Sequence, residues 1–137
     1  MTARRFLHCL IAGSLWGGFA YLLGVRAFGR PIWGGVLAGP IIGVIVGGVI
    51  QAPFERQAGL RRALLALASV YLAATLFGLA VAIGDWRALT AGTASPLWAL
   101  ATEVFAVWWG VTLTGFLLFL WPLAYGTHWI LEWRGAA

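Results

Sequence analysis

The sequence contains no lysine and no asparagine, one cysteine, and only four acidic residues among its 137 positions. Charged residues make up 9% of the chain, whereas about 25% is usual for a soluble domain. The lone cysteine, Cys9, cannot form a disulfide within the chain, and no zinc-binding spacing of Cys and His is present. No nucleophile, base and acid occur together as a recognisable set. We therefore expect no catalytic site and no metal site, and we interpret the chain as a protein that is not an enzyme.

Apolar residues dominate what is present. Hydrophobic residues account for 62% of the chain, and a soluble fold of this composition would expose large apolar patches and aggregate. All nine basic residues are arginines, which occur singly or in pairs between apolar runs. This distribution offers no continuous basic face for nucleic acid, but it suits contact with the anionic surface of a membrane.

Four apolar runs cover approximately residues 6–25, 32–50, 63–83 and 99–123. As helices, the first three runs and the most apolar part of the fourth, residues 104–123, are each about 30 Å long, which matches the hydrocarbon core of a bilayer. The sequence therefore predicts an all-α integral membrane protein with about four transmembrane helices in a single polytopic domain, residues 1–137. Ser95 and Pro96 are typical of a helix start, and Pro122 predicts a kink that turns residues 123–133 along the membrane interface.

The arginines also predict the orientation in the membrane. Six lie in the two tails and the second connection: Arg4, Arg5, Arg56, Arg61, Arg62 and Arg134. Three lie in the first and third connections: Arg26, Arg30 and Arg87. The positive-inside rule then places both termini in the cytoplasm, in a bacterial inner membrane of cytoplasmic or intracytoplasmic type. No small-residue cleavage site follows the first apolar run, so we expect that run to remain as a helix.

Regularly spaced glycines predict close helix packing. The second run carries four glycines at four-residue spacing, namely Gly35, Gly39, Gly43 and Gly47. The first run carries a matching pair, Gly13 and Gly17. Residues four apart share one helix face, so each set makes a smooth groove in which backbones approach closely. We expect the first two helices to pack together here. The alternative is that the groove receives a helix, a lipid tail or a pigment from outside the chain.

Aromatic residues mark a second predicted contact surface, in the fourth run. Phe105, Trp109 and Phe116 recur at spacings of four and seven, and Trp108 lies beside them. Such a stripe is too bulky and apolar to line a water path. It suits a partner helix, lipid tails or a carotenoid-like molecule. Exposure to lipid alone is the alternative interpretation.

Ionisable residues are absent from the centres of the predicted helices, where transporters usually keep them. Glu103 is the nearest candidate. We expect it to form an ion pair with Arg87 or another arginine on the same side of the membrane, and the alternatives are a proton or cation site or contact with a partner.

His128 is the remaining candidate ligand. Ala124 precedes it by one helical turn, and Trp133 and Arg134 follow it. These residues resemble the AxxxH and downstream Trp-Arg pattern of bacterial light-harvesting polypeptides, over about eleven residues. The resemblance implies that His128 ligates the magnesium of a chlorophyll-type pigment. In contrast to this chain, those polypeptides cross the membrane once, their C-termini face outward, and proline rather than Gly135 usually follows the arginine.

Two functions agree with these observations. The first is a non-catalytic accessory subunit within a larger energy-converting membrane complex of the photosynthetic or respiratory type. Its partners would be membrane lipids and other membrane subunits, and lipids, a carotenoid or a chlorophyll-type pigment would be bound at the interfaces. The second is a small four-helix channel or transporter that acts as an oligomer.

Overall fold

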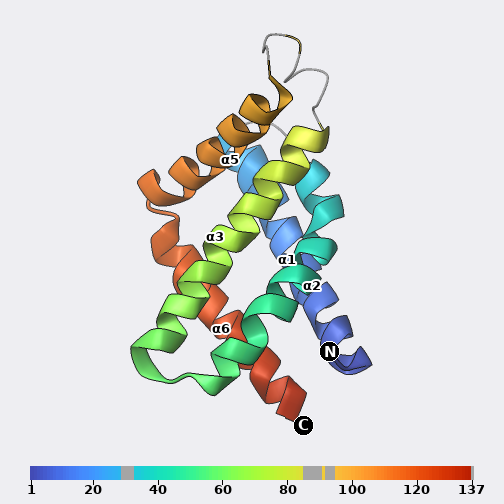
Figure 1. Cartoon of the computed structure of the whole chain (residues 1–137), viewed down its shortest axis with the longest axis vertical. Helices are drawn as coiled ribbons and strands as arrows, with labels where there is room; N and C mark the ends of the chain where they lie inside the picture. Colours follow the sequence, from blue (N-terminus) through green and yellow to red (C-terminus); the bar gives the residue numbers. More distant parts are fainter. Residues whose placement is uncertain (29–32, 85–90, 92–94, 137) are drawn as a thin grey trace.

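A computed structural model describes residues 1–28, 33–84, 91 and 95–136. The helices are α1 (Ala3–Phe28), α2 (Trp33–Arg56), α3 (Gly59–Gly84), α5 (Pro96–Leu113) and α6 (Leu117–Ala136), shown in Figure 1. All regular secondary structure in these ranges is helical, so the all-α prediction is confirmed. Among the residues that the structure describes, three segments are long and apolar enough to cross a membrane, namely Val36–Arg56, Gly59–Gly84 and Pro96–Leu113.

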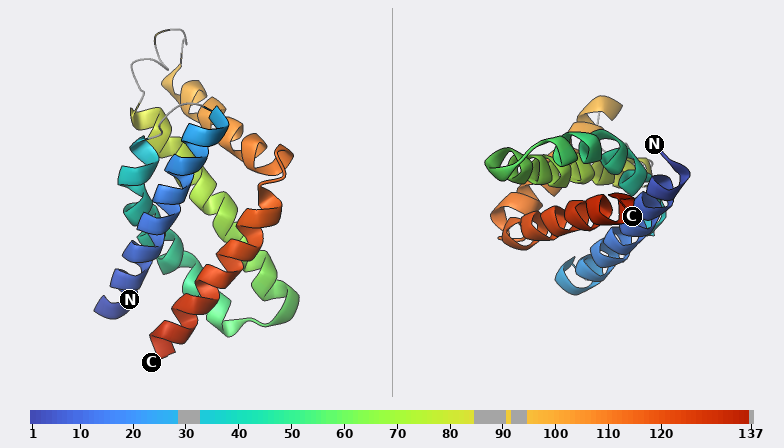
Figure 2. Two further views of the ribbon diagram at one scale, coloured as in Figure 1. Left: turned by 180° about the vertical axis from the view of Figure 1, so that it is seen from behind. Right: turned by 90° about the horizontal axis from the view of Figure 1, so that it is seen from below.

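The helices form a bundle in which both termini lie at the same end. α1 and α3 run in one direction, and α2, then α5 followed by α6, run back (Figure 1). We call the end that holds the N- and C-termini the terminal end. α1 packs mainly on α2, and α5 packs on α3, whereas α6 contacts α3, α1 and α2. Viewed along the bundle, α1 and α6 lie on the same side of the α2–α3 pair (Figure 2).

The helices extend beyond the apolar runs. α1 begins at Ala3, and α2 continues to Arg56 through residues predicted to lie in a connection. An α-helix satisfies its own backbone hydrogen bonds, so the apolar run and its polar flanks continue as one helix. At the start of α5, Pro96 occupies the first turn as expected, but the Ser95 side chain makes no capping hydrogen bond.

The predicted fourth helix, residues 99–123, is instead two helices. The interruption lies at Thr114–Phe116, where Gly115 has a positive φ of 73°, a conformation that side chains disfavour. The backbone N–H of Thr114 donates to Gly110 O at 3.3 Å, which ends α5. Pro122 lies inside α6 rather than at its boundary. The helix was predicted to continue uninterrupted to a kink at Pro122; it is interrupted earlier, at Gly115, and residues 123–133 belong to α6.

The best-packed core lies near the terminal end. Phe54 is 0% exposed and is the largest fully buried side chain among the described residues. It packs with Val46, Ile50 and Ala66, and with half-buried side chains that include Trp121 and Tyr125 from α6. This cluster holds α2, α3 and α6 together.

The α1–α2 contact is a seam of glycines. A Cβ atom placed on Gly43 would lie 2.5 Å from the carbonyl oxygen of Cys9 and 2.5 Å from Cα of Gly13. One placed on Gly39 would lie 2.6 Å from the Gly13 oxygen and 2.9 Å from Cα of Gly17. No side chain fits there. At Gly47 the neighbour is the Cys9 side chain rather than backbone, and the surroundings of Gly35 lie outside the described residues.

Candidate functional site

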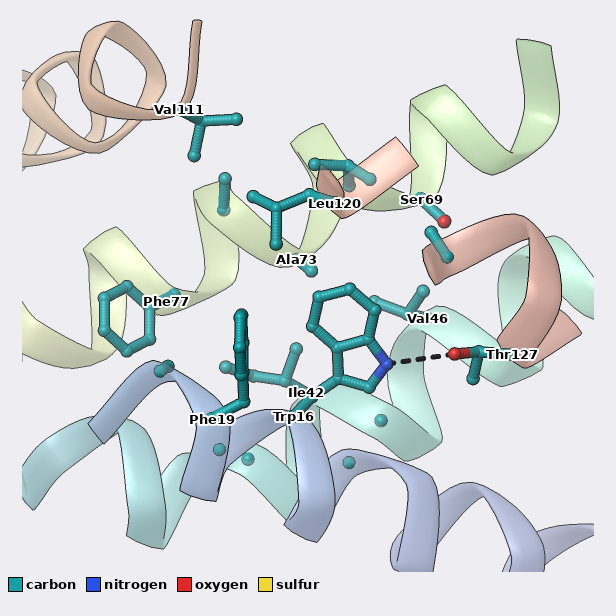
Figure 3. A pocket seen from close by; sticks show the side chains of 18 of the residues that line it. Trp16, Phe19, Ile42, Val46, Ser69, Ala73, Phe77, Val111, Leu120 and Thr127 are labelled. Carbon is teal, nitrogen blue, oxygen red and sulfur yellow. Dashed lines mark hydrogen bonds between the residues drawn. The ribbon is translucent and has the colours of Figure 1, made fainter. Parts of the chain in front are cut away.

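A cavity of about 450 Å³ lies at the centre of the bundle (Figure 3). Every described helix contributes to its wall. On α5 the lining residues are Glu103, Ala106, Val107, Gly110 and Val111, which recur at intervals of three and four and so form one helix face. α6 contributes a similar face that runs from Leu120 to Leu131 and includes His128. The volume falls within the range of about 300–1,000 Å³ typical of small-molecule pockets.

Most polar groups on this wall are already bonded to protein atoms. Trp16 Nε1 donates to Thr127 Oγ1 at 3.2 Å (Figure 3), and the Thr127 hydroxyl donates to the Leu123 carbonyl at 2.8 Å. The Ser69 hydroxyl donates to the Ala66 carbonyl at 2.7 Å. The wall therefore behaves as an apolar surface at these positions.

Glu103 differs from the other polar groups of the cavity. Its half-buried side chain lines the wall, and among the described residues it has no hydrogen-bond or ion-pair partner. The expected partner, Arg87, lies outside the described residues, and the expected ion pair with it therefore stays a prediction. A carboxylate on the wall of an apolar cavity is a candidate partner for a cation, because hydrogen bonds between two charged groups are the strong ones.

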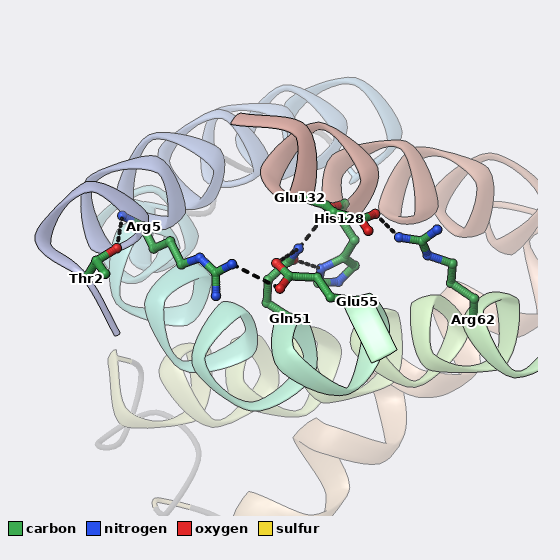
Figure 4. A network of polar contacts seen from close by, with 7 residues as sticks. All are labelled: Thr2, Arg5, Gln51, Glu55, Arg62, His128 and Glu132. Atoms are coloured by element: carbon green, nitrogen blue, oxygen red, sulfur yellow. Dashed lines mark hydrogen bonds and ion pairs between the residues drawn. The ribbon is translucent and has the colours of Figure 1, made fainter. Parts of the chain in front are cut away.

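A polar network closes the terminal end of the bundle (Figure 4). Arg5 of α1 forms a 3.0 Å salt bridge with Glu55 of α2. Gln51 Nε2 donates to the other Glu55 oxygen and to the backbone oxygen of His128, both at 3.1 Å. The amide oxygen of Gln51 lies 2.8 Å from His128 Nδ1. Since the Gln51 amide nitrogen already faces two acceptors, its oxygen accepts, and His128 Nδ1 carries the proton.

The network continues to α3. Arg62 forms an ion pair with Glu132 of α6, and its guanidinium lies 4.3 Å from the centre of the Phe54 ring. A guanidinium over an aromatic face is attracted by the ring quadrupole. The polar groups and the buried Phe54 together connect α1, α2, α3 and α6 at one end of the bundle.

His128 lies inside the bundle, beside Phe54. It is 4% exposed, and its ring lies 5.1 Å from the Phe54 ring. Ala124, one turn earlier, is buried as well. Both residues lie on the wall of the central cavity. Ligation of a pigment by His128 stays a prediction.

The predicted aromatic surface is divided by the helix break. Phe105 and Trp109 are 61% and 54% exposed on α5. Trp108 contacts α3, where its Nε1 donates a hydrogen bond to Thr75 Oγ1 at 2.9 Å. Phe116 follows the end of α5 and lines the central cavity. The single stripe predicted for Phe105, Trp109 and Phe116 was wrong, because it assumed an uninterrupted helix.

Sequence reasoning did not identify the polar network. One signal was available: Gln51 and Glu55 are four residues apart at the end of an apolar run, a spacing that places them on one helix face. The predicted topology also placed Arg5, Arg62 and Glu132 on one side of the membrane. Which acid pairs with which arginine depends on helix rotation, and the sequence pattern does not define it.

Within the described residues, no group of three or more His, Cys, Asp or Glu side chains is placed to hold a metal ion. Comparison with known proteins finds no match: no family model fits the chain, and no curated protein or solved structure is similar to it.

Proposed function

We propose that this protein is a non-catalytic accessory subunit that packs within a larger membrane complex of the energy-converting type. The observation that carries the proposal is the outer face of α5. Of the α5 residues, 6% are buried, against 28% in the apolar stretches of α2 and α3. α5 makes its main contact with α3 alone. An apolar helix with one neighbour leaves most of its surface for a partner or for lipid.

The aromatic residues of this face support a protein partner. Phe105 and Trp109 are four residues apart and both are more than half exposed. Large aromatic side chains give much contact area for little loss of conformational entropy, and they are enriched at the centres of interfaces. Trp108 adds rigidity, since its ring packs edge-on against Tyr71 of α3 at 5.4 Å. The face is therefore held in place before a partner arrives.

Replacing Phe105 and Trp109 together with leucine is expected to weaken association with native neighbours while leaving the fold intact. Both side chains point away from the bundle, so the double variant loses contact area without opening a cavity. Mild-detergent extraction followed by blue native electrophoresis measures the fraction of the protein in a large complex. The matched control is Phe119→Leu on α6, which is 73% exposed. Wild-type recovery of the complex with the double variant would show that this face contacts lipid only.

We also propose that the chain crosses a bacterial inner membrane four times, with both termini in the cytoplasm. The last crossing would be made by α5 and α6 together. The location of both termini at one end of the bundle supports an even number of crossings. The excess of arginines in the tails and the α2–α3 connection supports a cytoplasmic position for that end.

Reporter fusions test this topology. An alkaline phosphatase fused after Ala137 is expected to be inactive, and one inserted within Ala88–Thr93 is expected to be active, because that enzyme folds only outside the cytoplasm. Green fluorescent protein at the same two positions provides the reciprocal control. The same result at both positions would exclude a single crossing between the third connection and the C-terminus, and would overturn the proposed topology.

A small channel or transporter is the second candidate. The observation that favours it is Glu103, a half-buried carboxylate on the wall of a central cavity. The polar network argues against an open conduit, since it connects four helices at the terminal end. Solute flux in liposomes by the purified protein alone would favour the transporter over the accessory subunit.

A further inference from the structure

The central cavity differs from an ordinary packing defect in its size and in its wall. At about 450 Å³ it is several times the roughly 150 Å³ of an engineered cavity that binds benzene. The wall combines small residues from several helices, such as Ala73, Ala106 and Gly110, with larger apolar side chains. A space of this size in an apolar surrounding would hold an apolar molecule rather than water.

The cavity is also elongated. Its lining on α3 runs from Ser69 to Val81, a rise of about 18 Å along the helix. Trp16, Phe19 and Phe77 project toward the space between α1 and α3 (Figure 3). Flat aromatic faces along an elongated apolar space suit a linear hydrocarbon chain.

One residue of the described wall supplies a negative charge. The Trp16, Ser69 and Thr127 groups are bonded to protein atoms, and His128 Nδ1 is bonded to Gln51. Glu103 is the acidic residue on the described wall, and it has no hydrogen-bond or ion-pair partner among the described residues. It lies on α5 next to Val104, which contacts Gly78 of α3, whereas His128 lies beside Phe54 at the terminal end. The carboxylate therefore stands toward the end of the cavity opposite the terminal network.

We propose that the cavity binds a single-chain amphiphile whose protonated amine pairs with Glu103 and whose hydrocarbon chain extends toward Trp16. A carboxylate favours a cation over a neutral or anionic head group, because a charge-assisted hydrogen bond is about twice as strong as a neutral one and an anion would be repelled. The terminal network offers no second free site for the head group, since its arginines and acids pair with one another. This inference does not depend on docking through α5, because Phe105 and Trp109 do not line the cavity.

The test uses tryptophan quenching by bromine-labelled dodecylamine, with bromine-labelled dodecanol as the neutral probe of equal length. The purified protein is placed in phosphatidylcholine nanodiscs, and each probe is titrated. We expect saturable quenching by the amine that is absent in Trp16→Phe. Glu103→Gln should weaken amine binding about tenfold, the value expected for a lost charge-assisted hydrogen bond, and should not change binding of the alcohol. Glu103→Asp keeps the charge and should retain the preference for the amine.

A cavity-filling variant separates binding in the cavity from partition into lipid. A Cβ atom at Gly110 meets nothing within 4 Å, so the Gly110→Leu side chain can occupy the cavity without a backbone clash. We expect it to remove saturable quenching, whereas Gly18→Leu, which is equally unobstructed but does not line the cavity, should not.

Equal binding of amine and alcohol, both lost in Gly110→Leu, would mean that the cavity accepts any apolar chain and would overturn amine recognition. Quenching that persists in Gly110→Leu would place the probe in the surrounding lipid and would overturn the site itself. Neither result bears on docking through α5, which the Phe105 and Trp109 double variant tests by itself.

Discussion

Replacing Gly43 with alanine is expected to destabilise the protein by about 1–3 kcal/mol, the usual cost of overpacking. A single added carbon would lie 2.5 Å from both the Cys9 carbonyl oxygen and Cα of Gly13, and neither backbone atom can move without shifting α1. The two helices must separate along the seam. Thermal unfolding in mild detergent, followed by circular dichroism, should show a lower midpoint for the variant.

Gly48→Ala is the matched control for this experiment. Gly48 lies in the same helix, but a Cβ atom there meets nothing within 4 Å. Since alanine is favoured over glycine in a helix by about 1 kcal/mol, this variant should be neutral or slightly more stable. Equal midpoints for the two variants would show that the α1–α2 seam does not limit stability.

Phe54→Ala is expected to have the largest effect of any single side-chain truncation, about 3–5 kcal/mol. Phe54 is 0% exposed, and its ring packs against Tyr125 at 5.4 Å, against His128 and beneath the Arg62 guanidinium. Its removal leaves a cavity and also exposes the polar network to rearrangement. The unfolding midpoint should fall sharply, and protease should cut the region near the terminal end at lower temperature.

The corresponding control is Phe119→Ala, because Phe119 is 73% exposed on α6. Truncation there removes surface that faces lipid or detergent and opens no internal space. A loss of stability at Phe119 as large as that at Phe54 would mean that hydrophobic content, and not packing, sets the stability of the bundle.

The sequence was sufficient for the features that depend on local composition. Long apolar runs predict helices because the backbone has no other way to satisfy its hydrogen bonds in lipid, and α1, α2 and α3 lie where the first three runs predicted them. The four-residue glycine spacing defines a helix face without knowledge of the partner. Gly13, Gly39 and Gly43 lie in backbone contact in the structure.

Two features could not be predicted from local composition: the residue at which the last apolar run is interrupted, and the rotation of each helix about its axis. Gly115 and Pro122 both interrupt helices in principle, and the surrounding packing determines which one does. That choice moves Phe116 from an outer stripe to the cavity wall. The interruption also makes the rotation of α6 independent of α5, and in that rotation His128 contacts Gln51 and Glu132 pairs with Arg62.

The break at Gly115 also determines the dimensions of the bundle. α3 has 26 residues, about 39 Å of helix, whereas α5 and α6 have 18 and 20 residues, about 57 Å in all. The return path is therefore longer than the distance it has to cover, and the two helices meet at an angle and bow away from the bundle (Figure 2). The central cavity lies between this angled pair of helices and the rest of the bundle. The width of the central cavity therefore depends on the angle between α5 and α6 as well as on the side chains that line it.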